Sequence, residues 1–172
     1  MQLQDIITLA EYHAWANQRL MRRAAHLTNE QLHTKSWLSQ ETIFRTLAHL
    51  LDVQWSWRMA CESGWLPMEY ITAEDFDKIQ QLRKSWQTDD LALINYATSL
   101  TDQQLNQTIT YSWPQARPRV RPLWHILLHI INHGTHHRAE VGQYLATINR
   151  SPGDMDLLNY LASKNVEREG DS

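Results

Sequence analysis

The chain has 172 residues, a length that suits one domain with a sizeable hydrophobic core. Apolar residues make up 42% and the formal net charge is −3, which excludes a general basic surface for nucleic acid or anionic lipid. No apolar stretch reaches the roughly 18 residues of a membrane span, and the first residues lack the pattern of a secretory signal. The single cysteine, Cys61, excludes an internal disulfide, so we expect a cytoplasmic protein that binds neither nucleic acid nor membrane.

Helical periodicity dominates the chain and predicts four long helices. We expect them at residues 3–25, 41–61, 73–100 and 122–148. The third could break in two at Thr88-Asp89-Asp90, whereas Pro122 suits the first turn of the fourth. These helices and their connections of variable length predict an all-α four-helix bundle.

The connections carry signals of their own. Thr28 to Gln31 has the form of a helical capping box, and Thr101 to Gln104 repeats that form. Residues 109–120 are interrupted by Pro114 and Pro118 and predict an irregular or hairpin-like excursion. A short helix is expected at 155–162. We predict a single domain over residues 1–165 and a loose, charged tail over 166–172.

The segment from Asn132 to Val141 holds the residues that point most clearly to chemistry. His133 and His137 are four residues apart, so one helix presents both imidazoles on one side, a spacing that suits two ligands of a metal ion. On a helical wheel this pair falls at the edge of the apolar arc, whereas His125, His129 and His136 lie further toward the polar side. His129 and His133 have the same spacing and remain an alternative pair.

Other residues could complete such a site. His49 lies at the margin of the apolar stripe of the 41–61 helix and could supply a third imidazole, although a boundary histidine without a ligand fits the pattern equally well. His13 is a candidate for a fourth ligand. Glu140 and Asp52 could orient ligand imidazoles, or could simply face solvent.

Four parts of the chain resemble the DinB/YfiT-like superfamily of metalloenzymes. They are Tyr12-x-x-Trp15-Ala16-Asn17-x-x-Leu20, Leu47-Ala48-His49-Leu50 followed by Trp55 and Trp57, Pro122-Leu123-Trp124 leading into Asn132-His133-Gly134-Thr135-His136-His137-Arg138, and Asp156-Leu157-Leu158-Asn159-Tyr160-Leu161. The resemblance implies an up-down-down-up bundle, commonly dimeric, that typically holds a divalent metal through three histidines. On this chain those are His49, His133 and His137. Many relatives have Gly-Gln where this chain has Ala139-Glu140, which leaves these ligands in place but changes the charge nearby.

The resemblance also implies a reaction class, because several members are thiol S-transferases or isomerases that use a low-molecular-weight thiol such as bacillithiol, mycothiol or glutathione. We therefore expect a divalent-metal-dependent enzyme, using Zn, Ni, Fe or Mn, that activates a small thiol or water against a small electrophilic substrate. It would be an S-transferase or a hydrolase. The alternative is a non-catalytic metal-binding or stress-response protein, which a fourth protein ligand would favour. A dimeric structural bundle without metal is a third hypothesis.

Three further groups of residues bear on the chemistry of the site. The tryptophans Trp55, Trp57 and Trp124 could line an apolar pocket, although plain core packing explains most of the eight tryptophans. The proline-broken segment contains three arginines, Arg117, Arg119 and Arg121. They could bind a carboxylate of the thiol cosubstrate or the substrate, or they could lie on a solvated loop. Cys61 is not expected to be a nucleophile, because it ends a helix where the dipole disfavours a thiolate.

Overall fold

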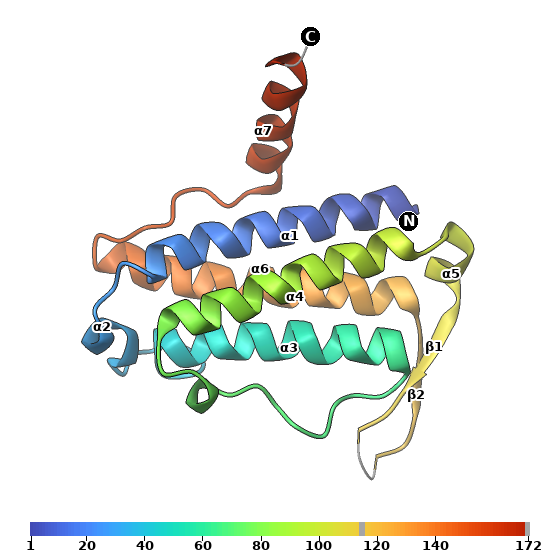
Figure 1. The fold of residues 1–172 in the computed structure, drawn as a ribbon, viewed down its shortest axis with the longest axis horizontal. Helices are drawn as coiled ribbons and strands as arrows, with labels where there is room; N and C mark the ends of the chain where they lie inside the picture. The colour runs from blue at the N-terminus through green and yellow to red at the C-terminus, as the bar shows by residue number, and fades with distance from the viewer. Residues whose placement is uncertain (114–115, 171–172) are drawn as a thin grey trace.

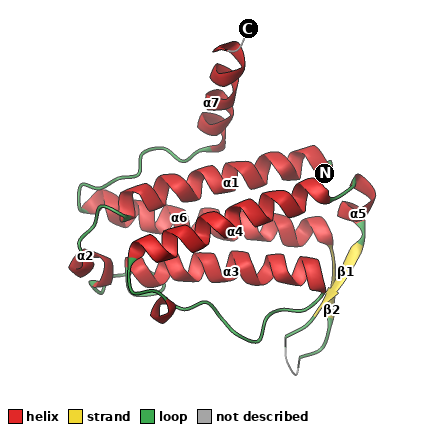
Figure 2. Cartoon of the chain, in the orientation of Figure 1, coloured by secondary structure: helices red, strands yellow, loops and turns green. Residues whose placement is uncertain are grey.

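Four long helices lie side by side in the computed structural model and form a bundle (Figures 1 and 2). The structure describes residues 1–113 and 116–170, with residues 165–170 described by their backbone alone. The bundle helices are α1 (Leu3–Ala24), α3 (Ile43–Ser63), α4 (Ile79–Ser99) and α6 (Leu123–Thr147). Helices α4 and α6 each contact both α1 and α3, so the four helices form a ring in the order α1, α4, α3, α6. The predicted all-α bundle is confirmed.

The helix directions follow the up-down-down-up order (Figure 1). Helices α1 and α6 run from right to left in the view, whereas α3 and α4 run from left to right. Because α3 and α4 are parallel, residues 64–78 must return along the length of the bundle, and they include the short 3-10 helix η1 (Ala73–Asp75). Within the described residues, we find no helix with both the length and the hydrophobicity that a membrane crossing needs.

Short elements close the two ends of the bundle. Helix α2 (Asn29–His33) links α1 to α3, and α5 (Asp102–Asn106) with the strands β1 (Thr108–Tyr111) and β2 (Arg119–Pro122) links α4 to α6. The two strands pair antiparallel, so the hairpin-like excursion is confirmed, although Pro114 lies outside the described residues.

Both predicted capping boxes are present. The hydroxyl of Thr28 accepts the N–H of Gln31, whose side-chain oxygen accepts the N–H of Thr28 in return. Thr101 and Gln104 make the same reciprocal pair at the start of α5. Each box satisfies two backbone N–H groups that a helix start leaves without intrahelical partners. The likeness between the two segments therefore reflects a shared way of starting a short helix.

The third long helix differs from its predicted bounds and does not take the break that the sequence allowed. The third long helix begins at Ile79 instead of near residue 73, because residues 73–75 form the separate turn η1. It also runs unbroken through Asp89 and Asp90, which are buried and accept hydrogen bonds from Gln54. Acidic residues that suggested a break in the sequence are thus part of the bundle interior.

The terminal helix α7 (Leu157–Gly170) is longer than the predicted 155–162 segment and stands away from the bundle (Figure 1). Tyr160 and Lys164 donate hydrogen bonds to Glu11 of α1 and so fasten its first turns. Residues 171 and 172 of the expected tail lie outside the described residues. The division into a domain of residues 1–165 and a loose tail stays a prediction.

A layer of polar side chains crosses the middle of the bundle and separates two apolar clusters. One cluster contains Leu20, Leu47, Trp86 and Leu145. The other lies nearer the hairpin and contains Ile6, Ala60, Leu93, Leu127 and Ile130. Between them lie buried polar residues from all four bundle helices: His13 and Asn17 from α1, Gln54 from α3, Asp90 from α4 and Arg138 from α6. Polar groups so deeply buried are stable only when they are hydrogen-bonded.

Gln54 and Arg138 satisfy most of this polar layer. The side-chain oxygen of Gln54 accepts from His13, Asn17 and Trp86, and its amide nitrogen donates to Asp89 and Asp90. Arg138 donates to Asn17 (2.8 Å), to Nδ1 of His13 (2.9 Å) and to Thr135 (2.9 Å). Because Arg138 donates to its Nδ1, the ring of His13 carries its proton on Nε2, which donates to Gln54.

Gly134 allows α1 to approach α6 at this layer. A Cβ atom at Gly134 would lie 2.2 Å from Cε1 of His13 and 2.7 Å from Nη1 of Arg138. Both of these side chains are buried and hydrogen-bonded, so neither can move aside without losing partners. The glycine of the histidine-rich motif is therefore a packing requirement.

We expect Gly134→Ala to lower the free energy of unfolding by about 1–3 kcal/mol, because the added methyl group must displace His13 or Arg138. Chemical denaturation followed by circular dichroism measures the change. Gly142→Ala on the same helix is the matched control, since its Cβ would meet the flexible end of Met155 at 3.3 Å and would lie at an ordinary contact distance of 3.6 Å from Cγ of Pro152. A Gly134→Ala protein as stable as the Gly142→Ala protein would contradict this account of the packing.

The polar layer also predicts a pH dependence of stability. Burial raises the pKa of Asp90 from 3.8 to about 7, with the charge of Asp89 adding to the effect. The folded protein therefore holds this proton more tightly than the unfolded chain, so the stabilisation is complete below pH 3.8 and is lost as the pH rises to about 7.

Asp90→Asn removes this ionisation and keeps an oxygen that accepts from Asn17 and Gln54. We expect the unfolding free energy of the variant, relative to the wild type, to rise by about 3 kcal/mol across this pH range. Denaturant titrations of both proteins at several pH values measure the difference. Parallel stability curves would show that Asp90 ionises alike in the folded and unfolded chains.

Candidate metal centre

The rotational setting of α6 directs the signature histidines toward α3. Gly134 and Arg138 are four residues apart and both face α1, where they meet His13. His133 and His137 precede them by one residue each, which turns the histidine pair by about 100° around the helix axis. That rotation points the pair at α3, the other helix that α6 packs against. One face of α6 thus holds the polar layer and the adjacent face holds the histidines.

His49 of α3 meets this pair. The candidate ligand atoms of His49, His133 and His137 all lie within 4.8 Å of one another. The ring centroid of His49 is 5.2 Å from that of His133 and 5.1 Å from that of His137, and the two α6 rings are 4.6 Å apart. His137 is buried, whereas the other two are half-buried. The three histidines converge on one point at the edge of the bundle.

A carboxylate and a hydroxyl hold the ring of His137. Oε2 of Glu140 lies 2.8 Å from Nδ1 of His137, and the hydroxyl of Ser39 lies 3.3 Å from the same nitrogen. Ser39 also donates its backbone N–H and its hydroxyl to Glu140, which anchors the carboxylate. With Nδ1–H donating to Glu140, Nε2 of His137 keeps its lone pair, an arrangement typical of histidines that bind metals.

The electrostatics of the cluster favour neutral imidazoles at His49 and His133. Burial and the neighbouring histidines lower the pKa of His133 to about 3, and burial with His137 nearby lowers the pKa of His49. Burial alone would raise the pKa of Glu140, but its hydrogen bonds from His137 and Ser39 outweigh that effect and lower it. Neutral imidazoles at His49 and His133 keep the lone pairs that a divalent cation needs.

The other candidate histidines have different surroundings. His13 is part of the polar layer, where both ring nitrogens are hydrogen-bonded and burial holds its pKa well below the ordinary value. It is therefore not the suggested fourth member of the cluster.

His129 lies beside His133, with ring centroids 5.8 Å apart, but its ring also packs against Trp57. His136 is exposed, and with His137 and Glu140 it forms a second close group that shares His137 with the first.

Asp52 does not orient a histidine. Its carboxylate accepts the backbone N–H of Ile71 at 2.8 Å, and burial raises its pKa. This contact fastens the returning segment 64–78 to α3. Glu140 and Asp52 are the two carboxylates that could orient ligand imidazoles. In the part of the chain that the structure describes, only Glu140 contacts one of these imidazoles, that of His137.

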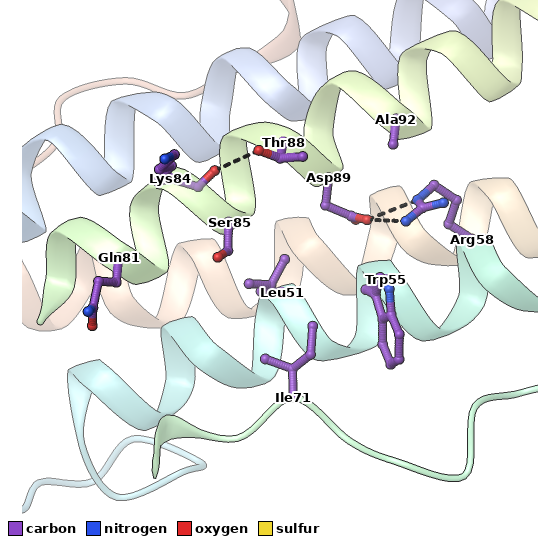
Figure 3. Close-up of a pocket in the computed structure, with 10 residues that line it drawn as sticks. All are labelled: Leu51, Trp55, Arg58, Ile71, Gln81, Lys84, Ser85, Thr88, Asp89 and Ala92. Carbon is purple, nitrogen blue, oxygen red and sulfur yellow. Dashed lines mark hydrogen bonds and ion pairs between the residues drawn. The ribbon is translucent and has the colours of Figure 1, made fainter. Parts of the chain in front are cut away.

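A hollow of about 320 Å³ opens beside His49. It lies between the start of α3 and the returning segment, and its polar lining includes Arg45, Asp52, Tyr70 and Glu74. A larger hollow of about 550 Å³ lies between α3, α4 and the same segment (Figure 3). No histidine of the cluster lines it, so the smaller hollow is the better candidate for a substrate pocket despite its size.

The candidate tryptophans and arginines lie in different parts of the structure. Trp55 lines the larger hollow, and Trp124 stacks edge-on against His125. Trp57 packs against Tyr111 and Trp113 of the hairpin segment, next to His129. The hairpin-segment arginines Arg117, Arg119 and Arg121 are exposed, and Arg119 lies over the ring of Trp113.

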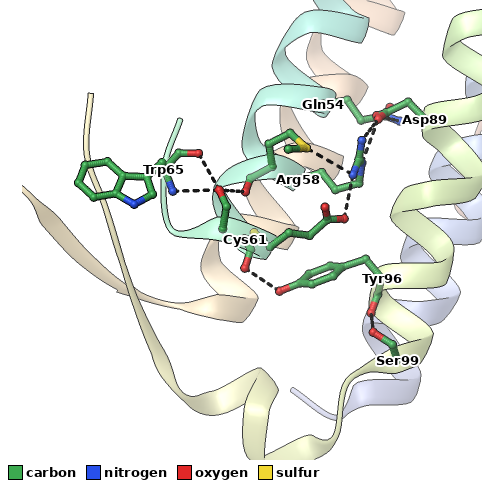
Figure 4. A network of polar contacts seen from close by, with 10 residues as sticks. Gln54, Arg58, Cys61, Trp65, Asp89, Tyr96 and Ser99 are labelled. Carbon is green, nitrogen blue, oxygen red and sulfur yellow. Dashed lines mark hydrogen bonds and ion pairs between the residues drawn. The ribbon is translucent and has the colours of Figure 1, made fainter. Parts of the chain in front are cut away.

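Cys61 is buried at the end of α3, where its carbonyl accepts a hydrogen bond from Tyr96 (Figure 4). Burial raises the pKa of its thiol to about 12, with Glu62 adding to the effect. A thiol that keeps its proton at neutral pH is a poor nucleophile and a poor metal ligand.

Sequence reasoning missed the polar layer. Asn17, Gln54 and Asp90 each interrupt the apolar stripe of their helix near its middle, and this repeated interruption was the available signal. It also missed Ser39, which precedes α3 and contacts Glu140 only through the folding of the chain.

The chain is thus a helical-bundle protein with a candidate three-histidine metal centre between its second and fourth long helices. The sequence matches the DinB family over residues 1–170, and the chain belongs to that family. A crystal structure of a DinB-like protein from Bacillus cereus ATCC 10987 is similar, with a TM-score of 0.60 and 16% identity over 84% of this chain and 91% of that one. At this identity the likeness shows the fold alone. No curated protein matches the sequence.

We expect Cys61 in the folded protein to resist a chromogenic disulfide reagent at mildly alkaline pH, because its thiol is buried and protonated. Absorbance during labelling measures the rate. The same sample in guanidinium chloride is the control and should release one equivalent at once. Rapid labelling without denaturant would show that the thiol is accessible and ionised.

Proposed function

We propose that this chain is a divalent-metal-dependent enzyme that activates a small thiol or water against a small electrophilic substrate. It would act as an S-transferase or a hydrolase. The convergence of His49, His133 and His137 within 4.8 Å is the observation that carries the proposal. Membership of the DinB family and the hydrogen bond from His137 to Glu140 support it.

The donor set suits the proposed ions. Three neutral imidazoles would leave a divalent ion its full charge and a coordination position for a ligand from outside the protein. Zn, Ni, Fe and Mn all accept imidazole nitrogen. When bound, such an ion acts as a Lewis acid that lowers the pKa of a coordinated water or thiol toward neutrality.

The remaining residues of the site bind and orient. Glu140 would keep Nε2 of His137 available, while the hollow beside His49 would receive the substrate. Arg45 lines that hollow and pairs with Glu74 at 2.9 Å, but both side chains are more than half exposed. Exposed ion pairs are weak, so a carboxylate of a thiol cosubstrate could replace Glu74 as the partner of Arg45.

The position of His13 favours an enzyme over the alternative of a non-catalytic metal-binding or stress-response protein. A closed sphere would need a fourth protein ligand, for which His13 was the candidate, yet both of its ring nitrogens are engaged by Gln54 and Arg138. Because His13 is not a ligand, a metal ion held by the three histidines would keep a coordination position for a substrate. The homodimer and the cytoplasmic location stay predictions.

We expect the purified protein to bind about one equivalent of divalent metal per chain and His49→Ala, His133→Ala and His137→Ala each to lose most of it. Glu140→Gln should weaken binding by about 10–100-fold, because it loosens the ring of His137. Elemental analysis after dialysis measures occupancy. A parallel assay mixes the protein with a small thiol and an aromatic halide as the electrophile. It compares the rate of thiol loss with and without the metal.

His125→Ala is the matched control, since this exposed histidine of α6 lies outside the cluster, and His129→Ala tests the alternative pair. Full metal occupancy in the three cluster variants would overturn the ligand assignment. Metal binding without stimulated transfer or hydrolysis across a broad panel of electrophiles would leave the non-catalytic alternative.

A further inference from the structure

A cationic hollow lies at the end of α1 and shares no residue with the histidine cluster. Its volume is about 290 Å³, and it is lined by Arg19, Arg22, Arg23, His26 and Pro152. The spacing of the arginines places them on one side of the last turns of α1. The chain as a whole has a net charge of −3, so this is a local concentration of positive charge.

The three arginines have no acidic partners in the part of the chain that the structure describes. Neither an ion pair nor a side-chain hydrogen bond links Arg19, Arg22 or Arg23 to another described residue. Arg45 and Arg58, by contrast, each contact two carboxylates. Neighbouring guanidinium groups without counter-charges repel one another, and a bound anion would relieve that repulsion.

Arg19 is held in place before any ligand arrives. Its guanidinium lies 4.9 Å from the ring centroid of Trp15, and its Nε is buried without a hydrogen-bond partner. On its other side, a Cβ at Gly153 would come within 3.1 Å of Nη2, so the glycine turn leaves room for the arginine. The helix dipole accounts for cations in the last turn, such as Arg22 and Arg23, but not for Arg19 one turn earlier.

We propose that this hollow binds the phosphoryl group of a small phosphate monoester. A single carboxylate takes one guanidinium fork, whereas a phosphoryl group offers three terminal oxygens and up to two negative charges. That matches three arginines around a hollow of about 290 Å³. The organic part of the ester would extend toward solvent, because Arg22 and Arg23 are exposed.

Titration calorimetry with glycerol phosphate tests the site. We expect saturable one-to-one binding that Arg22→Gln/Arg23→Gln weakens by about tenfold or more, since each lost charge-assisted contact costs about that much affinity. Both side chains are exposed, so the variant should fold, which circular dichroism verifies. Perturbation of the Arg19 Nε–H signal in NMR spectra of the wild type reports the third arginine without a substitution.

Three controls separate this site from others. Arg121→Gln removes one exposed charge from the hairpin and should bind as the wild type does. His133→Ala should also keep its affinity, because the hollow lies outside the histidine cluster. Acetate should bind much more weakly than glycerol phosphate. Absent binding, equal loss in Arg121→Gln and the double variant, or equal affinity for acetate would each overturn the proposal.

Discussion

The guanidinium of Arg138 lies in the centre of the bundle, and its hydrogen bonds to Asn17, His13 and Thr135 set how α6 faces its neighbours. Burial lowers the pKa of Arg138, yet an arginine stays charged in proteins. A buried charge is tolerated only while its donors are satisfied, so a rotation or a slide of α6 would be costly. The constraint on Arg138 is consequently a constraint on its neighbour His137 and, one turn away, on His133.

The rest of the polar layer extends this constraint to all four bundle helices. Gln54 bonds to residues of α1 and α4, and it lies on the same helix as His49, five residues further along. An apolar core tolerates small shifts between helices, whereas a connected hydrogen-bond layer fits in one register. Such a layer therefore supports the close approach of the three histidines, whose candidate ligand atoms lie within 4.8 Å of one another although they come from two helices. Burying these polar groups costs free energy, so the layer adds little to the stability of the fold. Its hydrogen bonds instead fix the positions of the helices relative to one another.

The sequence predicted what depends on local pattern. The approximate helix positions, the capping boxes at Thr28 and Thr101, and the hairpin followed from periodicity and turn chemistry. The wheel favoured His133 and His137, which lie close to His49 in the structure, and their role as metal ligands stays a prediction. The sequence could not predict what depends on contacts between distant segments. His13 looks like a ligand on its own helix, and only its contacts with Gln54 and Arg138 assign it to the polar layer. The same reason explains why Asp90 suggested a helix break and why Ser39 went unnoticed.

The central claim is that the imidazoles of α3 and α6 hold one cation together. X-ray absorption spectroscopy of the wild-type protein loaded with Zn or Ni measures this most directly, because imidazole ligands give characteristic outer-shell scattering. The account predicts a first shell of nitrogen and oxygen with scattering from three imidazoles, one for each residue of the cluster. A first shell containing sulfur, or scattering from at most one imidazole, would contradict it.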